Sequence, residues 1–196
     1  MKVVVLHGSA RKGGNTDTLA EHFLRGLGES GDHEVAHFRP SEMRIEHCRA
    51  CLECARGKGC VVDDDMQAVY PAFCGADVVV LATPMFWGYM TSQLKTLFDR
   101  LEAIVSDRCF GGKDFVLLIG YRHYFGSMVE WMSRIAGFSG SRAHAVTAQT
   151  FDSTTRKDIP IRELPEKLAE AHRLGKHLGS AAKASFASVP PAAGPV

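Results

Sequence analysis

An apolar run near the middle of the chain constrains the fold more than any other feature. Residues 76–83 contain four consecutive large apolar residues, from Val78 to Leu81, without the polar alternation of a strand that faces solvent on one side. A strand that is apolar on both faces is typical of a parallel sheet covered by helices on each side. Residues 115–119 form a second such run. The sequence therefore predicts an α/β domain around a buried parallel sheet.

Strand-like and helix-like segments alternate along the whole chain. Further short strands are predicted at residues 3–7, 34–38 and 142–150. Between the strands, apolar residues recur at intervals of three and four, which predicts amphipathic helices. These helices are expected around residues 19–27, 63–74, 94–105, 125–136 and 165–184, with the acidic residues 63–65 at the start of the second. Since crossovers between parallel strands are right-handed, we expect a doubly wound, five-stranded parallel sheet with helices on both faces.

Length and charge bound the class of protein. With 196 residues, 45% of them apolar, we expect a single domain over residues 1–187 and a disordered tail over residues 188–196. The 23 basic and 22 acidic residues nearly cancel, so the chain lacks the basic excess typical of nucleic-acid binding. No apolar run is long enough for a membrane span, and the first is too short for a signal peptide. We expect a cytoplasmic protein with neither nucleic acid nor membrane as a partner.

Four cysteines lie within thirteen residues, in a loop predicted over residues 43–62, after the second strand. They are Cys48, Cys51, Cys54 and Cys60. Three thiols at successive two-residue gaps, with a fourth after five more residues, can surround one object, as cysteine ligation of an iron-sulfur cube requires. In a reducing compartment such a set is more often metal-binding or catalytic than disulfide-bonded. The spacing therefore predicts a [4Fe-4S] cluster on these four thiolates.

Two other interpretations of the cysteine run stay open. A structural zinc site usually joins two separated Cys-x-x-Cys pairs, which fits this spacing less well. The run also departs from the bacterial ferredoxin pattern, because its last gap is five residues and Val61 follows in place of proline. Unmetallated thiols are therefore the second alternative. Cys74 and Cys109 lie outside the run on apolar segments, and we expect them to be core residues rather than ligands.

A glycine-rich segment, residues 8–16, leaves the first strand and opens the first helix. Its glycines let backbone N–H groups form an anion-binding nest, to which the helix dipole and the hydroxyls of Ser9 and Thr16 add attraction. The segment matches neither a nucleoside-triphosphate loop nor a dinucleotide fingerprint. It therefore predicts one phosphate, held by the nest and Arg11, with an ordinary glycine-rich turn as the alternative.

Two aromatic segments follow strands at the same predicted edge of the sheet, where doubly wound folds bind ligands. Residues 83–90 follow the third strand and residues 120–126 the fourth. Aromatic and thioether side chains suit a flat ring system, so three loops could enclose one flavin. The alternative is a hydrophobic loop that packs on a neighbour or on another subunit.

Together with the segment from Gln93 to Arg100, these motifs resemble the iron-sulfur flavoprotein family, a branch of the NADPH-dependent FMN reductase group with a flavodoxin-like fold. The resemblance covers residues 1 to about 105, and more loosely extends to 150. It implies FMN as the flavin, a [4Fe-4S] cluster on the four cysteines, and electron transfer between them. It also implies a dimer or tetramer in which the cluster of one subunit approaches the flavin of another.

The resemblance also implies the site residues. Those that would hold the FMN phosphate are Ser9, Arg11, Gly14, Asn15 and Thr16. Those that would flank the flavin ring are Pro84, Met85, Phe86, Trp87 and Gly88, with Gly120, Tyr121 and Arg122 from the fourth loop. Relatives tend to carry small residues in that fourth loop, whereas residues 121–125 are bulky here, so the substrate face departs from the family pattern.

Two histidines, His7 and His123, are candidates for catalysis, but neither has a residue pattern that assigns it a catalytic role. We expect His7 to be a buried, hydrogen-bonded imidazole and His123 to be solvated or packed, with proton relay near FMN as the alternative for His123. The predicted function is electron transfer through FMN and the cluster, between a ferredoxin-like donor or NAD(P)H and a small acceptor. The alternatives are an NAD(P)H-dependent FMN or quinone reductase without a cluster, and a non-enzymatic flavodoxin-like or zinc-stabilised interaction module.

Overall fold

The computed structural model describes residues 1–187, with the side chains of residues 1–181. Its main sheet consists of β1 (Lys2–His7), β2 (Glu34–Phe38), β3 (Val78–Pro84), β4 (Asp114–Tyr121) and β5 (Arg142–Gln149). The strand order is β2-β1-β3-β4-β5, and every neighbouring pair is parallel. This is the flavodoxin-like order, in which the chain switches direction across the sheet between β1 and β3. The predicted doubly wound, five-stranded parallel sheet is confirmed.

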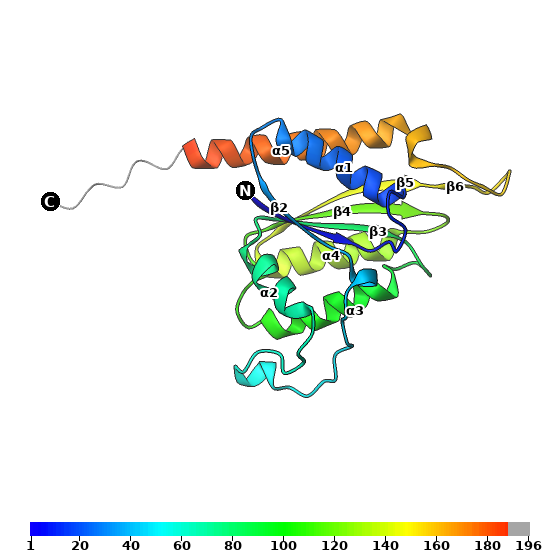
Figure 1. Cartoon of the computed structure of the whole chain (residues 1–196). Coiled ribbons are helices and arrows are strands. Elements are labelled where there is room, and N and C mark those ends of the chain that lie inside the picture. The colour runs from blue at the N-terminus through cyan, green and yellow to red at the C-terminus, as the bar shows by residue number, and fades with distance from the viewer. Residues whose placement is uncertain (188–196) are drawn as a thin grey trace.

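Helices cover both faces of the sheet and make three layers (Figure 1). One face carries α1 (Asn15–Gly28) and α5 (Pro165–Ala187), and the other carries α2 (Met66–Gly75), α3 (Ser92–Arg100) and α4 (Gly126–Ser139). The side chains of β3 point alternately into the two apolar cores, one on each face, and its first six residues are buried. The burial explains why this strand shows no polar alternation.

Several short elements were not expected from the sequence. An antiparallel hairpin of β6 (Phe151–Asp152) and β7 (Lys157–Asp158) extends beyond the end of β5 (Figure 1). The predicted helix around residues 94–105 is α3 followed by a 3-10 turn, η3 (Leu101–Ile104). Other 3-10 turns are η1 (Pro40–Glu42), η2 (Cys54–Arg56) and η4 (Ile161–Glu163).

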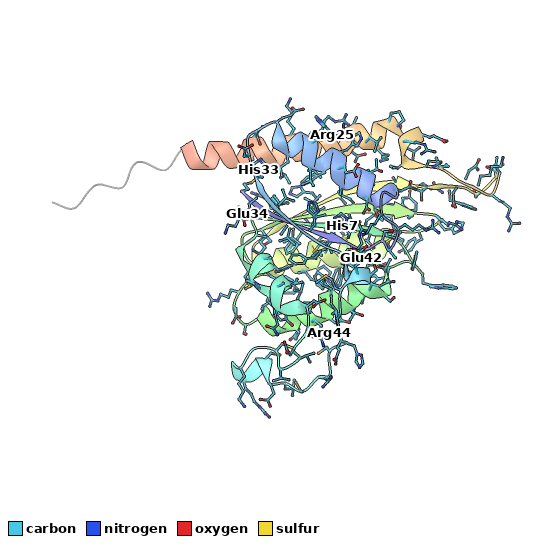
Figure 2. All side chains as sticks on the ribbon, in the orientation of Figure 1. His7, Arg25, His33, Glu34, Glu42 and Arg44 are labelled. Atoms are coloured by element: carbon cyan, nitrogen blue, oxygen red, sulfur yellow. A yellow bond between two sulfur atoms is a disulfide. The ribbon has the colours of Figure 1, made fainter. Side chains whose placement is uncertain are left out.

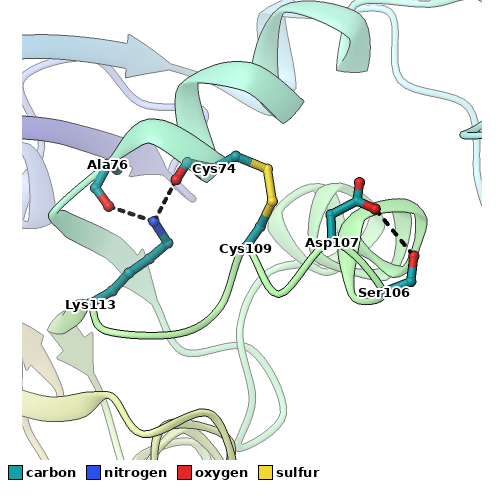
Figure 3. The surroundings of a disulfide bond; sticks show 6 residues. All are labelled: Cys74, Ala76, Ser106, Asp107, Cys109 and Lys113. Carbon is teal, nitrogen blue, oxygen red and sulfur yellow. Dashed lines mark hydrogen bonds between the residues drawn. A yellow bond between two sulfur atoms is a disulfide. The ribbon is translucent and has the colours of Figure 1, made fainter.

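Cys74 and Cys109 form a disulfide with each other (Figure 3). They were expected to be core residues outside the ligand set, and both do lie in or against the apolar core. Their pairing was not expected, and it arises because the segment after η3 returns to the last turn of α2. Beside the disulfide, the buried Lys113 ammonium donates hydrogen bonds to the carbonyls of Cys74 and Ala76. Lys113 thereby satisfies carbonyls that the end of α2 would leave without partners.

The expected disordered tail, residues 188–196, lies outside the described residues. Within the described part, none of the helices combines the length and the apolar character needed to cross a bilayer.

Candidate functional site

Three loops meet at the carboxyl edge of the sheet, following β1, β3 and β4. The first two are joined by hydrogen bonds from the Gly8 N–H to the Ala82 carbonyl (2.8 Å) and from the Thr91 hydroxyl to the Gly8 carbonyl (2.7 Å). The Met85 N–H donates to the Gly120 carbonyl (2.9 Å), which ties the second loop to the third. The structure therefore brings all three predicted flavin loops together at the switch point, where this fold binds ligands.

The loop after β1 presents backbone donors at the start of α1. Gly14 is the N-cap of this helix and makes no side-chain cap, so the first-turn N–H groups point outward without a capping oxygen. The Ser9 hydroxyl accepts from the Arg11 N–H at 3.1 Å, and Gly13 adopts a left-handed φ of 65°. Arg11 is exposed beside this turn. Such an uncapped helix start suits a phosphate.

The side chain of Asn15 binds protein rather than facing an open site. Its Oδ1 accepts from the Ile161 N–H at 3.0 Å, and its Nδ2 donates to the Ile159 carbonyl at 3.5 Å. Thr16 is 3% exposed beneath the loop. Asn15 thus holds the glycine-rich loop against the segment that follows the β6–β7 hairpin.

Asp17 supports the same loop from below. This carboxylate is 5% exposed. Its Oδ2 accepts from the Gly13 N–H (2.9 Å) and from Arg39 (2.8 Å), and its Oδ1 lies 2.8 Å from Nδ1 of His7. Burial alone would raise the pKa of Asp17, but hydrogen bonds from His7 and Arg39 outweigh burial and lower this pKa. Arg39 also donates to the Ser9 carbonyl, so one hydrogen-bond network holds the loop after β1 at both Ser9 and Gly13.

His7 is buried and hydrogen-bonded, as predicted, at the carboxyl end of β1 (Figure 2). Its Nε2 lies 3.0 Å from Nδ1 of His37 on β2, and the two rings stack. A cavity of about 670 Å³ adjoins these rings, and Lys12 and Met43 are among the residues that line it. Sequence reasoning missed both partners, because Asp17 and His37 come from other elements.

The loop after β3 presents aromatic rings to solvent. Phe86 and Tyr89 exchange backbone hydrogen bonds of 2.8 and 3.1 Å around Trp87 and Gly88, which both have positive φ. This two-residue turn leaves the Trp87 side chain fully exposed and Phe86 56% exposed. A hydrogen bond of 2.7 Å from the Ser127 hydroxyl to the Gly88 carbonyl fixes the turn against α4. The turn therefore places apolar aromatic surface at the carboxyl edge of the sheet.

The loop after β4 packs on the β6–β7 hairpin. Arg122 forms an ion pair of 2.7 Å with Asp158, and its guanidinium lies 5.0 Å from the centre of the Phe151 ring. His123 contacts the same ring edge-on, at 5.2 Å between centroids. The expected packing role of His123 is confirmed. Tyr121 packs on Phe125, with 4.6 Å between ring centroids.

The cysteine loop lies on the far side of α2 and α3 from the sheet (Figure 1). All four cysteines are unpaired; Cys48 and Cys51 are exposed, whereas Cys54 and Cys60 are partly buried. Across residues whose positions the structure describes, no three His, Cys, Asp or Glu side chains gather closely enough to hold a metal ion. The four thiols therefore share one loop but do not converge.

The backbone of this loop alternates in handedness between the cysteines. Ala50 (φ 52°) and Leu52 (φ 63°) are left-handed without being glycine, and Gly57 and Gly59 are left-handed between Cys54 and Cys60. A left-handed non-glycine residue costs about 1–3 kcal/mol, and such strain concentrates at functional sites. Alternating handedness also forms the concave nests that bind iron-sulfur centres. The donor chemistry and the backbone both fit a thiolate-bound cluster.

Cys60 is the thiol that the protein contacts most closely. Nη2 of Arg100, a residue only 2% exposed, donates to its Sγ at 3.2 Å. Burial alone would raise the pKa of Cys60, but hydrogen bonds from the Val62 N–H, Tyr70 and Arg100 outweigh burial and lower this pKa. Sequence reasoning did not identify Tyr70, because a tyrosine on the buried stripe of a helix is indistinguishable from a core residue.

Asp64 is the counterion of Arg100. It contacts both Nη atoms of the guanidinium and accepts from the Glu46 and Met66 N–H groups at 2.9 and 3.1 Å. Residues 63–65 were predicted to form the acidic first turn of a helix, but α2 begins at Met66, so they precede the helix and Asp65 is its N-cap. The ion pair at Asp64 is an additional role that the sequence did not indicate.

Comparisons with known proteins identify the family and relatives of the chain. The model of the NADPH-dependent FMN reductase family matches residues 1–158. The chain is 36% identical over 189 residues to an iron-sulfur flavoprotein of Methanosarcina thermophila, covering 85% of this chain and 98% of that protein. It is 41% identical over 107 residues to an iron-sulfur flavoprotein of Methanocaldococcus jannaschii, covering 54% of this chain and 53% of that protein, about half of its length.

A solved structure shows the same fold. The FMN-dependent NADH-azoreductase of Bacillus anthracis, in complex with FMN, superposes with a TM-score of 0.66 at 14% identity, covering 93% of this chain and 99% of that chain. At that level of identity the likeness concerns the fold alone.

Proposed function

The chain belongs to the NADPH-dependent FMN reductase family of flavin-dependent oxidoreductases, among the iron-sulfur flavoproteins, and on that premise we propose that it binds FMN at the carboxyl edge of its sheet and a [4Fe-4S] cluster on its cysteine loop. When bound, FMN exchanges one or two electrons and the cluster exchanges one. The protein would pass electrons between a ferredoxin-like donor or NAD(P)H and a small acceptor.

The FMN site follows from the three joined loops. Ser9, Arg11, Thr16 and the backbone N–H groups around Gly14 would hold the phosphate, because α1 begins there without a side-chain cap. Asn15 would act indirectly, since its amide already binds residues 159 and 161. Pro84 to Gly88, with Gly120, Tyr121 and Arg122, would border the flavin ring.

One observation carries the cluster proposal. Four unpaired thiols lie on one loop with left-handed residues in each gap between them, next to a buried arginine. Since the thiols do not converge on their own, we expect that ligation moves the exposed Cys48 and Cys51 inward and orders the loop. Coupling of this kind between metal binding and local folding is common in small metal sites.

The position of the cysteine loop supports an oligomer. Helices α2 and α3 separate the loop from the sheet of its own chain (Figure 1). The exposed rings of Phe86, Trp87 and Tyr124 offer apolar surface at the flavin edge. A homodimer or tetramer that brings one subunit's cysteine loop to another subunit's flavin edge would bury this surface.

One observation favours a second candidate, a flavin reductase without a cluster: the described thiols are not gathered in advance. The two candidates differ in inorganic content. Anaerobically purified protein should contain one FMN and about four iron and four acid-labile sulfide atoms per chain. Cys51→Ala should lose the iron and sulfide and retain FMN. Bound FMN in a wild-type protein that stays free of iron, even after reconstitution with iron and sulfide, would favour the second candidate.

A further inference from the structure

A buried cation lies directly beneath the cysteine loop. Arg100 is the last residue of α3 and the largest fully buried side chain of the molecule's described part. Besides its contacts with Asp64 and Cys60, it donates to the Glu46 carbonyl at 2.7 Å, so it touches the loop before and after the cysteine run. Its Nε is the one buried side-chain nitrogen or oxygen without a hydrogen-bond partner among the residues described.

Nη2 of Arg100 donates to the sulfur of Cys60 at 3.2 Å. The same Nη2 donates to the Tyr70 oxygen at 3.3 Å, which leaves the Tyr70 proton free to point toward the sulfur. A hydrogen bond from a guanidinium is stronger when the acceptor is negatively charged, as a cluster-bound sulfur is.

The other end of the cysteine run has no comparable setting, because Cys48 and Cys51 are exposed at the surface. The two ends of the cysteine run therefore differ in their surroundings. A cluster held by all four sulfurs would have one ligand hydrogen-bonded within the protein and two ligands toward solvent or a neighbouring molecule.

We propose that Arg100 and Tyr70 are positioning residues that hold Cys60 and raise the reduction potential of the cluster through its sulfur. This inference rests on the proposed function. Reduction adds one electron to the cluster, and a fixed positive charge and hydrogen bonds to a ligand sulfur stabilise the more negative state. No bond is formed or broken, and the electron comes from the donor already proposed.

Tyr70→Phe is the most specific test, since it removes one hydroxyl and keeps the ring. Iron, sulfide and FMN content should equal those of the wild type. In an anaerobic titration followed by the electron paramagnetic resonance signal of the reduced cluster, the reduced-to-oxidised ratio at a fixed potential should fall about tenfold, which corresponds to about 59 mV for one electron. Tyr89→Phe, which removes a hydroxyl from the flavin loop, should leave the cluster potential unchanged.

Arginine variants provide the second measurement. Arg100→Lys keeps the charge and loses the forked donor, so it should lower the potential. Arg100→Gln alone would leave Asp64 buried without a counterion, so it is paired with Asp64→Asn. This double variant keeps the net charge and removes the guanidinium donor to Cys60, so its potential should be lower than that of the wild type. If Arg100 had a purely structural role, these variants would change the melting temperature and leave the reduction potential of loaded protein unaltered.

Wild-type potentials in fully loaded Tyr70→Phe and Arg100→Lys would overturn this inference alone, whereas wild-type protein that cannot be loaded with iron would overturn the proposed function as well.

Discussion

Arg39 reaches from the end of β2 to Asp17 in the first turn of α1, with its Nη2 2.8 Å from Oδ2 of the carboxylate. Since the same Oδ2 accepts from the Gly13 N–H and Arg39 donates to the Ser9 carbonyl, the pair determines the shape of the loop that we assign to the FMN phosphate. Neither residue needs to touch the flavin. Their effect on binding would come through the position of the backbone donors.

Asp17→Asn should weaken binding of FMN about tenfold, or about 1.4 kcal/mol, and should weaken binding of riboflavin less, because riboflavin lacks the phosphate. Loss of the buried charge should also lower the free energy of unfolding by about 3 kcal/mol. Fluorescence titration with both flavins measures the first effect and urea denaturation the second. The exposed Asp32→Asn is the matched control. An equal loss of affinity for both flavins would show that Asp17 does not act on the phosphate loop.

Arg11→Ala should weaken FMN binding with little change in stability, since Arg11 is exposed at the phosphate turn. The expected loss is about tenfold, typical of one charge-assisted hydrogen bond to an anion. The same fluorescence titration measures the dissociation constant. If that constant is unaltered, Arg11 points away from the ligand.

Acid should destabilise the protein partly through Asp17. The pKa of Asp17 is lowered in the folded state, so the folded state binds this proton less tightly than the unfolded state. The stability that the Asp17 carboxylate contributes is therefore fully present above the ordinary pKa of aspartate, near 4. It is lost as the pH falls through the lower pKa that Asp17 has in the folded state. Urea denaturation between pH 7 and pH 3 should show a shallower loss of stability in Asp17→Asn. Parallel curves for the two proteins would argue against this contribution.

The double variant Cys74→Ala/Cys109→Ala should lower the free energy of unfolding by about 2–4 kcal/mol, because it removes the cross-link between α2 and the segment after η3. Iron and sulfide content should not change, since these two cysteines lie outside the cysteine loop. Urea denaturation and metal analysis of the same preparations measure both quantities. Loss of iron in the double variant would mean that the ligand set is assigned wrongly.

Local patterns explain which parts of the fold were predictable. The buried strands β3 and β4 and the glycine-rich turn at Gly13 are each encoded by neighbouring residues, so periodicity and composition reveal them. The β6–β7 hairpin was missed because its strands have two residues each and are largely polar. The Cys74–Cys109 pair was missed because pairing depends on how 35 residues of chain return to α2.

The site was predictable to a similar extent. The sequence indicated Ser9, the aromatic turn around Trp87 and the four cysteines, all of which stand out by residue type. It did not indicate the Asp17–Arg39 pair or the donors around Cys60, because these contacts arise only when α1 meets β2 and when α3 ends beneath the cysteine loop. The spacing predicts four thiols around one cluster, and among the described residues they do not yet converge, since the bound cluster itself would draw them together.

The number of electrons that each chain accepts tests the central claim most directly. Anaerobically purified protein is titrated with dithionite while the flavin and cluster absorbances are followed. A chain that holds both groups should take up about three electrons, two on FMN and one on the cluster. Uptake of about two electrons per chain, with a spectrum of flavin alone in protein reconstituted with iron and sulfide, would contradict the account.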